Sequence, residues 1–196
     1  MDTKLQQQLD FILEIDKEKN IYRQTHLSNN GRKENDAEHA WHMAIMVYLL
    51  KEYSNINFDL AKALIMCLIH DIVEIDAGDT YAYDEEALKT QKAREDAAKE
   101  RIFSILPKAQ AEELLNIFNE FEENTTPEAR FVHTIDNLQP IILNNSNNGN
   151  DWREHGVKKS QVLKRQELSK PGSDILYNYI CELINKNTEL GNLKDE

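Results

Sequence analysis

The chain has 196 residues, of which 40% are hydrophobic, enough for one globular domain with a buried core. Its 35 acidic and 23 basic residues give a formal net charge of −12, which argues against a protein that coats nucleic acid, because that role needs a basic face. The N-terminal residues lack the pattern of a secretory signal, and no window approaches 18 uninterrupted apolar residues, so we expect no membrane segment. Cys67 and Cys181 lie in apolar stretches without paired spacing, which is typical of a reduced, cytoplasmic protein.

Six glycines, four prolines and a recurring 3.6-residue period predict an all-α fold, a helical bundle of about seven or eight helices. We expect a single domain over residues 1–196, with a motif-bearing core at about 30–145 and C-terminal helices with a frayed tail at 146–196. In chain order we expect helices at about residues 4–16, 36–53, 59–74, 84–106, 107–121, 126–142, 151–169 (with Gly156 as a candidate interruption) and 173–186. Residues 17–35 are predicted as a long polar connection, and residues 144–150 as an asparagine-rich break.

Four polar residues interrupt otherwise apolar helices: His39, His70, Asp71 and Asp136. Each alone is more often a hydrogen-bonded core residue than a ligand, but burying all four is costly unless they share a purpose. Two imidazoles and two carboxylates without a thiolate suit one divalent ion, such as Mn, Co, Fe, Ni, Zn or Mg. Two further carboxylates, on Glu74 and Asp79, follow the His-Asp doublet closely.

Three segments in this order resemble the HD-domain metal-dependent phosphohydrolases, in particular their 5′-deoxynucleotidase-like branch. They are residues 34–41 (ENDAEHAW), 70–80 (HDIVEIDAGDT) and 133–139 (HTIDNLQ). The resemblance extends over about residues 5–185 and implies the helical HD-domain fold.

The resemblance also implies roles for individual residues. His39, His70, Asp71 and Asp136 match the metal ligands of the family. Glu74 matches the acid that positions or deprotonates the attacking water, and Asp79 matches a second carboxylate that protonates the leaving group or orients the substrate. Arg23 matches a substrate-binding arginine, and Arg32, Lys33 and Thr80 are further candidates for contacts with the substrate. Few histidines lie between the doublet and Asp136, which favours one metal ion over two.

The implied reaction is hydrolysis of the 5′-phosphate of a nucleoside monophosphate by a metal-activated water, in a homodimeric enzyme. The deoxynucleotidases place a tryptophan close after the arginine, whereas Arg23 is followed by Gln24, Thr25 and His26, so the choice between deoxyribose and ribose stays open. Two alternatives also stay open: a hydrolase of another small phosphate or pyrophosphate, such as a guanosine alarmone, and a sensor that binds metal and nucleotide without turnover.

Overall fold

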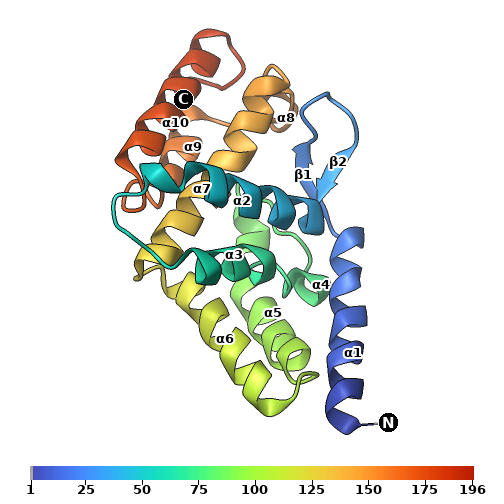
Figure 1. Ribbon diagram of the computed structural model, residues 1–196. Coiled ribbons are helices and arrows are strands. Elements are labelled where there is room, and N and C mark those ends of the chain that lie inside the picture. The colour runs from blue at the N-terminus through green and yellow to red at the C-terminus, as the bar shows by residue number, and fades with distance from the viewer. Residues whose placement is uncertain (1) are drawn as a thin grey trace.

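The computed structural model describes residues 2–196 and is dominated by helices, as Figure 1 shows. The helices are α1 (Thr3–Ile15), α2 (Asp36–Leu50), α3 (Leu60–Ile69), α4 (Glu74–Ala77), α5 (Glu85–Phe103), α6 (Lys108–Glu123), α7 (Pro127–Ser146), α8 (Asn150–His155), α9 (Lys159–Gln166) and α10 (Asp174–Glu189). Short 3₁₀ turns η1 (Asp16–Asn20) and η2 (Lys51–Tyr53) and the strands β1 (Tyr22–His26) and β2 (Lys33–Asn35) complete it. The predicted all-α class is therefore confirmed, with a small two-stranded sheet added.

Helix α7 is the centre of the bundle, where α2, α3, α6 and α10 pack against it. Phe131 and Ile135 on this helix are fully buried, in a cluster with Met43 from α2 and Met66 from α3. The capping hydroxyl of Thr126 and Pro127 at the first position begin α7 as the sequence predicts. Pro140 lies inside the helix and has no N–H to donate to the carbonyl of Asp136, so α7 lacks that one helical hydrogen bond.

The predicted polar connection at residues 17–35 is instead the 3₁₀ turn η1 followed by the hairpin β1–β2. Tyr22 pairs with Asn35 and His26 with Lys33, in antiparallel register. The side chains on this hairpin are almost all polar, so no alternation of apolar and polar residues marks the strands in the sequence. His26 fastens the hairpin to α8, because its backbone N–H donates to Asp151 Oδ2 at 3.0 Å and its ring Nδ1 lies 2.6 Å from Asp151 Oδ1.

The predicted helix at residues 59–74 is broken into two. Helix α3 ends at Ile69, residues 70–73 form turns, and the single turn α4 follows. Gly78 ends α4 with a φ of +74°, a conformation that favours glycine, and its N–H bonds to the carbonyl of Glu74 at 2.7 Å. This break places His70, Asp71 and Glu74 on a short, sharply turning segment at one end of the bundle.

The C-terminal tail, expected to be frayed, is ordered by specific contacts. Leu193 is buried in the main core, and the backbone of Lys194 bonds to Val157 and Lys159. The side chains of Asn187 and Asn192 bond to each other at 2.8 Å beneath it. A single apolar residue and two amide side chains carry too little periodic signal for sequence analysis to recognise this packing.

The loop after α9 lies directly against α7. A Cβ atom added at Gly172 would come within 2.2 Å of the carbonyl oxygen of Arg130, so glycine is required by this close approach. Thr134 on α7 donates its hydroxyl to the carbonyl of Ser169 at 2.7 Å. These contacts fix α9 beside the middle of α7. In the described part of the chain, no helix combines the length and apolarity needed to cross a bilayer.

Candidate active site

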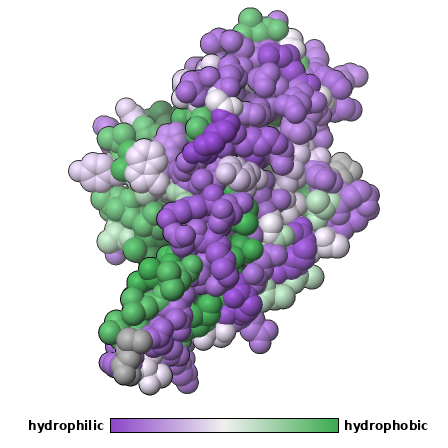
Figure 2. Space-filling view, turned by 90° about the vertical axis from the view of Figure 1, so that its right-hand side faces the viewer, coloured by the Kyte–Doolittle hydropathy of each residue, from purple (hydrophilic) through white to green (hydrophobic). Residues whose placement is uncertain are grey.

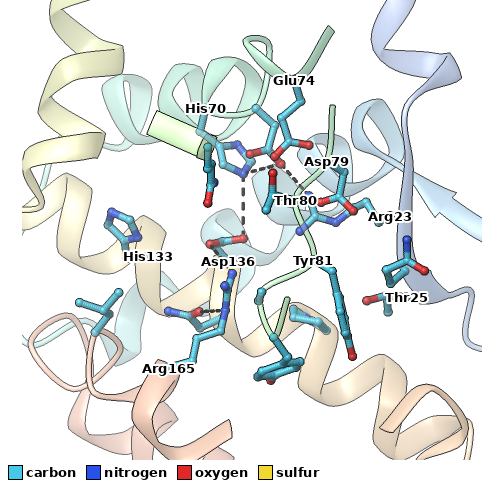
Figure 3. Close-up of a pocket in the computed structure, with 18 of the residues that line it drawn as sticks. Arg23, Thr25, His70, Glu74, Asp79, Thr80, Tyr81, His133, Asp136 and Arg165 are labelled. Atoms are coloured by element: carbon cyan, nitrogen blue, oxygen red, sulfur yellow. Dashed lines mark hydrogen bonds and ion pairs between the residues drawn. The ribbon is translucent and has the colours of Figure 1, made fainter. Parts of the chain in front are cut away.

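Four of the predicted residues converge where α2, the end of α3 and α7 meet, and Figure 3 shows two of them, His70 and Asp136, at the cavity. His39 Nε2 lies 3.1 Å from Asp136 Oδ1 and 4.0 Å from Asp71 Oδ2. His70 Nε2 lies 3.1 Å from Asp71 Oδ2 and 4.0 Å from Asp136 Oδ1. His39, His70 and Asp136 thus each bring one atom to within 4.8 Å of the others, and Asp71 approaches His70 from the side where it also groups with Asp36 and Glu74.

Local sequence fixes the position of the first histidine. Asn35 caps α2 by accepting the backbone N–H of Glu38 at 2.9 Å, and the Glu38 side chain accepts the N–H of Asn35 at 3.2 Å. This reciprocal capping box defines the first turn of α2. His39, one residue after Glu38, is therefore held at a defined angle and is fully buried.

The hydrogen bonds of His70 leave a nitrogen available for a cation. Its Nδ1 lies 2.9 Å from the carbonyl oxygen of Cys67, and a carbonyl only accepts, so Nδ1 carries the proton. Nε2 of His70 is buried and makes no hydrogen bond of good geometry, although Asp71 Oδ2 lies 3.1 Å away. A neutral histidine with its second nitrogen bonded to a backbone carbonyl is the usual state of a metal ligand. The residues present therefore fit a divalent ion.

A second layer of polar residues supports His39, and the sequence analysis did not identify it. Glu34 Oε2 lies 3.7 Å from His39 Nδ1, and Gln139 Nε2 donates to Glu34 Oε1 at 2.7 Å. All three side chains are buried. A carboxylate behind a ligating histidine orients the ring and raises its basicity. The signal was present in the sequence, because Glu34 is the first residue of the first-histidine segment, residues 34–41.

Glu74 lies beside the cluster with a buried oxygen, Oε2, that has no hydrogen-bond partner. Burial, with Asp71 and Asp36 nearby, holds the pKa of Glu74 well above its ordinary value. Asp36 is fully buried, and burial with the charge of Asp71 raises its pKa to about 7. The sequence analysis treated Asp36 only as a helix start, although it lies three residues before His39, on the same face of α2.

The ligand cluster and Glu74 lie at a cavity in the protein. Asp79, Thr80 and Arg23 also line this cavity. Burial raises the pKa of Asp79 above its ordinary value. Thr80 accepts a hydrogen bond from Arg94 at 2.8 Å, which fixes the segment after Gly78. Arg23 donates to Asp71 Oδ2 at 2.7 Å and lies 3.6 Å from Asp36 Oδ1, so its charge is balanced by carboxylates.

The structure does not bring Arg32 and Lys33 to this cavity, whose volume is about 310 Å³. Arg32 forms an ion pair with Glu38, and Lys33 donates to Gln24 Oε1 at 2.5 Å. The strand alternation and the turn of the hairpin direct both side chains elsewhere. A different cation, Arg165 of α9, lines the cavity, and its distance from the motifs along the chain explains why sequence reasoning missed it.

Two other histidines have bonds that keep them from the ligand cluster. His133 stacks on Phe121 with ring centroids 4.0 Å apart, and its Nε2 lies 2.9 Å from the carbonyl of Phe121. His42 Nδ1 accepts from Gln139 at 3.2 Å and does not line the cavity. His133 does line it and forms part of an aromatic wall.

Glu18, in η1, is a buried carboxylate that the sequence analysis left in a polar connection. Burial and the charge of Asp71 raise its pKa to about 8. A carboxylate with a raised pKa binds protons more tightly in the folded chain than in the unfolded chain. Stability then falls as pH rises from the ordinary value of 4.5 toward 8.

The first prediction concerns metal binding. Addition of Mn²⁺ to chelator-treated protein should raise Tm by about 5–10 °C at saturating metal, because binding stabilises only the folded state. Asp136→Asn should reduce this shift to below about 2 °C. Differential scanning calorimetry measures both. The exposed Asp195→Asn should keep the full shift, and a wild-type protein without any metal-dependent shift would contradict the ligand assignment.

The second prediction concerns pH. In metal-free protein, Glu18→Gln should raise Tm by about 5 °C at pH 8, because the buried charge is then absent. The gain should shrink toward zero at pH 5, where wild-type Glu18 is protonated in the folded state. Thermal unfolding at the two pH values tests this. Glu123→Gln, at an exposed site, is the matched control, and an equal gain at both pH values would show that titration of Glu18 is not the cause.

Comparison with known proteins agrees with this geometry. Residues 15–174 match a family model described as HD domain. The chain is 29% identical over 114 residues to human 5'-deoxynucleotidase HDDC2 and 30% identical over 122 residues to the Xenopus laevis protein of that name. These alignments cover 58% and 62% of this chain, and 54% and 57% of those proteins. The chain therefore spans about half the length of the curated relatives it matches.

Solved structures match the fold over nearly the whole chain. A structure described as a predicted metal-dependent phosphohydrolase from Magnetospirillum magnetotacticum superposes with a TM-score of 0.93 at 41% identity, covering 98% of this chain and 96% of that one. A conserved hypothetical protein from Pyrococcus furiosus, at 23% identity and a TM-score of 0.61, shares the fold over 92% of this chain and 99% of its own. Because the family model matches most of its residues, the chain belongs to the HD domain family.

Proposed function

We propose that the chain is a metal-dependent phosphohydrolase that releases phosphate from the 5′ position of nucleoside monophosphates. One observation carries the proposal: a buried cluster of two histidines and two aspartates, in which His70 Nε2 makes no hydrogen bond of good geometry, opens directly onto a cavity that also contains Glu74 and Asp79. The cavity volume of about 310 Å³ lies at the lower end of the range for small-ligand sites, about 300–1,000 Å³. Relatives named 5'-deoxynucleotidases support the same reaction class.

The proposed ligands are His39, His70, Asp71 and Asp136, holding one divalent ion. When bound, such an ion lowers the pKa of water and neutralises charge on phosphoryl oxygens. Glu74 accepts the proton of the water that attacks phosphorus. Its raised pKa makes it, once ionised, a stronger base than an exposed glutamate.

The remaining groups act on the phosphate ester. The bond between phosphorus and the 5′ oxygen breaks, and Asp79 donates a proton to that oxygen. Burial favours the protonated form of Asp79 that this step requires. Arg23 and Thr80 border the cavity beside Asp79 and orient the substrate. The proposed location is the cytoplasm, supported by the two cysteines, which are free thiols in the fold.

The third prediction tests this reaction. Chelator-treated protein supplied separately with Mn²⁺, Co²⁺, Mg²⁺ or Zn²⁺ should release phosphate from deoxynucleoside and ribonucleoside monophosphates only when metal is present. Glu74→Gln should lower kcat by at least about 100-fold while the metal-dependent Tm shift persists, because a general base contributes rate and not metal affinity. Free phosphate detection measures the rate.

Glu100→Gln, at an exposed position of α5, serves as the matched control and should keep wild-type turnover. Full turnover by Glu74→Gln would contradict the role of that residue. No release from any nucleoside monophosphate, while metal binds, would contradict the reaction. Release of phosphate from a guanosine alarmone instead would identify that compound class as the substrate. Nucleotide binding without turnover would identify a sensor.

We also propose that two copies of the chain associate through the exposed face of α2. Trp41, Ile45, Tyr48 and Leu49 form a stripe on α2, with 63%, 44%, 53% and 62% of their surface exposed. Residues 41–50 contain no aspartate, glutamate, lysine or arginine, so two copies of a chain with net charge −12 meet there without repulsion. Figure 2 shows a further gathering of apolar side chains over α1, along the lower left of the view; on that helix Leu5, Leu9, Ile12 and Leu13 are exposed.

The fourth prediction tests the dimer. Wild-type protein should have twice the chain mass in size-exclusion chromatography with light scattering. The double substitution Trp41→Glu and Leu49→Glu should give the monomer mass, because it places charge in an apolar interface. Leu190→Glu, which changes an equally exposed leucine on another surface, should leave the mass unchanged. A monomeric wild type at micromolar concentration would contradict the proposal.

A further inference from the structure

The site is strongly acidic, although its proposed substrate is a phosphate dianion. Among the described residues that line the cavity, the permanently charged cations are Arg23 and Arg165. Arg23 already donates to Asp71 at 2.7 Å and lies beside Asp36, so its charge is used within the carboxylate cluster. The second arginine is therefore the cation with capacity for a ligand.

Arg165 reaches the cavity from α9, on the side of Asp136 away from Arg23 (Figure 3). Its Nε donates to Asn137 Oδ1 at 3.0 Å, and its Nη2 lies 3.9 Å from Asp136 Oδ2. Within the described residues, neither terminal nitrogen has a partner within hydrogen-bond distance. The bond through Nε fixes the plane of the guanidinium and leaves its two terminal nitrogens facing the cavity side.

Asn137 adds an independent observation. Its side chain is 2% exposed and lines the cavity, and its Nδ2 has no hydrogen-bond partner. A buried amide donor without an acceptor costs free energy unless a ligand or water satisfies it. The Oδ1 of the same amide accepts the hydrogen bond from Arg165 Nε. This bond holds the donor groups of the two side chains next to each other.

We infer that Arg165 and Asn137 form the phosphate-binding wall of the site. Asp136 faces His39 with Oδ1 and Arg165 with Oδ2, so the candidate ligand cluster and the arginine share one carboxylate. A phosphoryl group at the cluster is therefore within the range of the guanidinium, whose forked donors match two phosphate oxygens. This inference deepens the proposed function and rests on it.

The alternative role for Arg165 is to orient Asp136 without touching the substrate. The two roles differ in what the arginine stabilises. A residue that binds phosphate changes the affinity for phosphate and leaves metal affinity intact. A residue that only positions Asp136 changes metal affinity first, because Asp136 is a candidate ligand.

The fifth prediction separates these roles by calorimetric titration of Mn²⁺, and then of inorganic phosphate into the Mn²⁺-loaded protein. Arg165→Gln should weaken phosphate binding by at least about ten-fold and change Mn²⁺ affinity by less than about three-fold. Arg165→Lys should restore part of the phosphate affinity, because it keeps the charge without the fork. Lys164→Gln, which removes an exposed charge from the same helix, should match wild type.

Unchanged phosphate affinity in Arg165→Gln, a parallel loss of Mn²⁺ affinity, or the absence of phosphate binding by wild type would each overturn the inference. The Tm of each variant confirms folding, and Arg165→Lys provides the comparison if the glutamine variant unfolds. If wild type binds phosphate but hydrolyses no nucleoside monophosphate, the proposed reaction fails while the titration still decides the role of Arg165.

Discussion

The burial of two imidazoles and two carboxylates in one apolar bundle is the constraint on which the rest of the structure depends. Isolated charges in such a place are costly, and they are tolerated only when every one has a counterpart. Here Arg23 on the hairpin pairs with Asp71 and the carbonyl of Cys67 bonds to His70, while Gln139 holds the Glu34 carboxylate near His39. The hairpin places Arg23, the break after α3 places His70, and the capping box of α2 places His39, so each of these elements orients one member of the cluster or its partner.

This arrangement divides the site into an acidic and a cationic side. Glu74 and Asp79 lie on the segment that turns at Gly78, and Arg23 reaches the same side of the cavity from strand β1. Arg165 comes from the opposite side, on a helix that Gly172 allows to lie against α7. In the proposed mechanism, proton transfer and anion binding fall to different elements, which both meet at Asp136.

Most of the helices and the candidate ligands could be predicted from sequence, because polar residues in apolar helices stand out and helix periodicity is strong. His39, His70 and Asp136 belong to that class. The hairpin could not, because its side chains are almost all polar and carry no alternation. Arg165 and Glu18 could not either, since each resembles an ordinary surface charge until tertiary contacts place it beside the cluster. The packing of the C-terminal tail could not be predicted either, because it rests on one leucine, two amide side chains and backbone bonds that leave no periodic pattern in the sequence.

The sequence separation of the contacts that build the site has a consequence for how the chain acquires activity. Arg23 meets Asp71 across 48 residues, His39 meets Asp136 across 97, and His26 meets Asp151 across 125. Contacts between such distant segments form only after large loops have closed, which is entropically slow. Local helices can therefore assemble well before the site exists. Recovery of metal binding during refolding would report the last steps of assembly, while helical content would report the first.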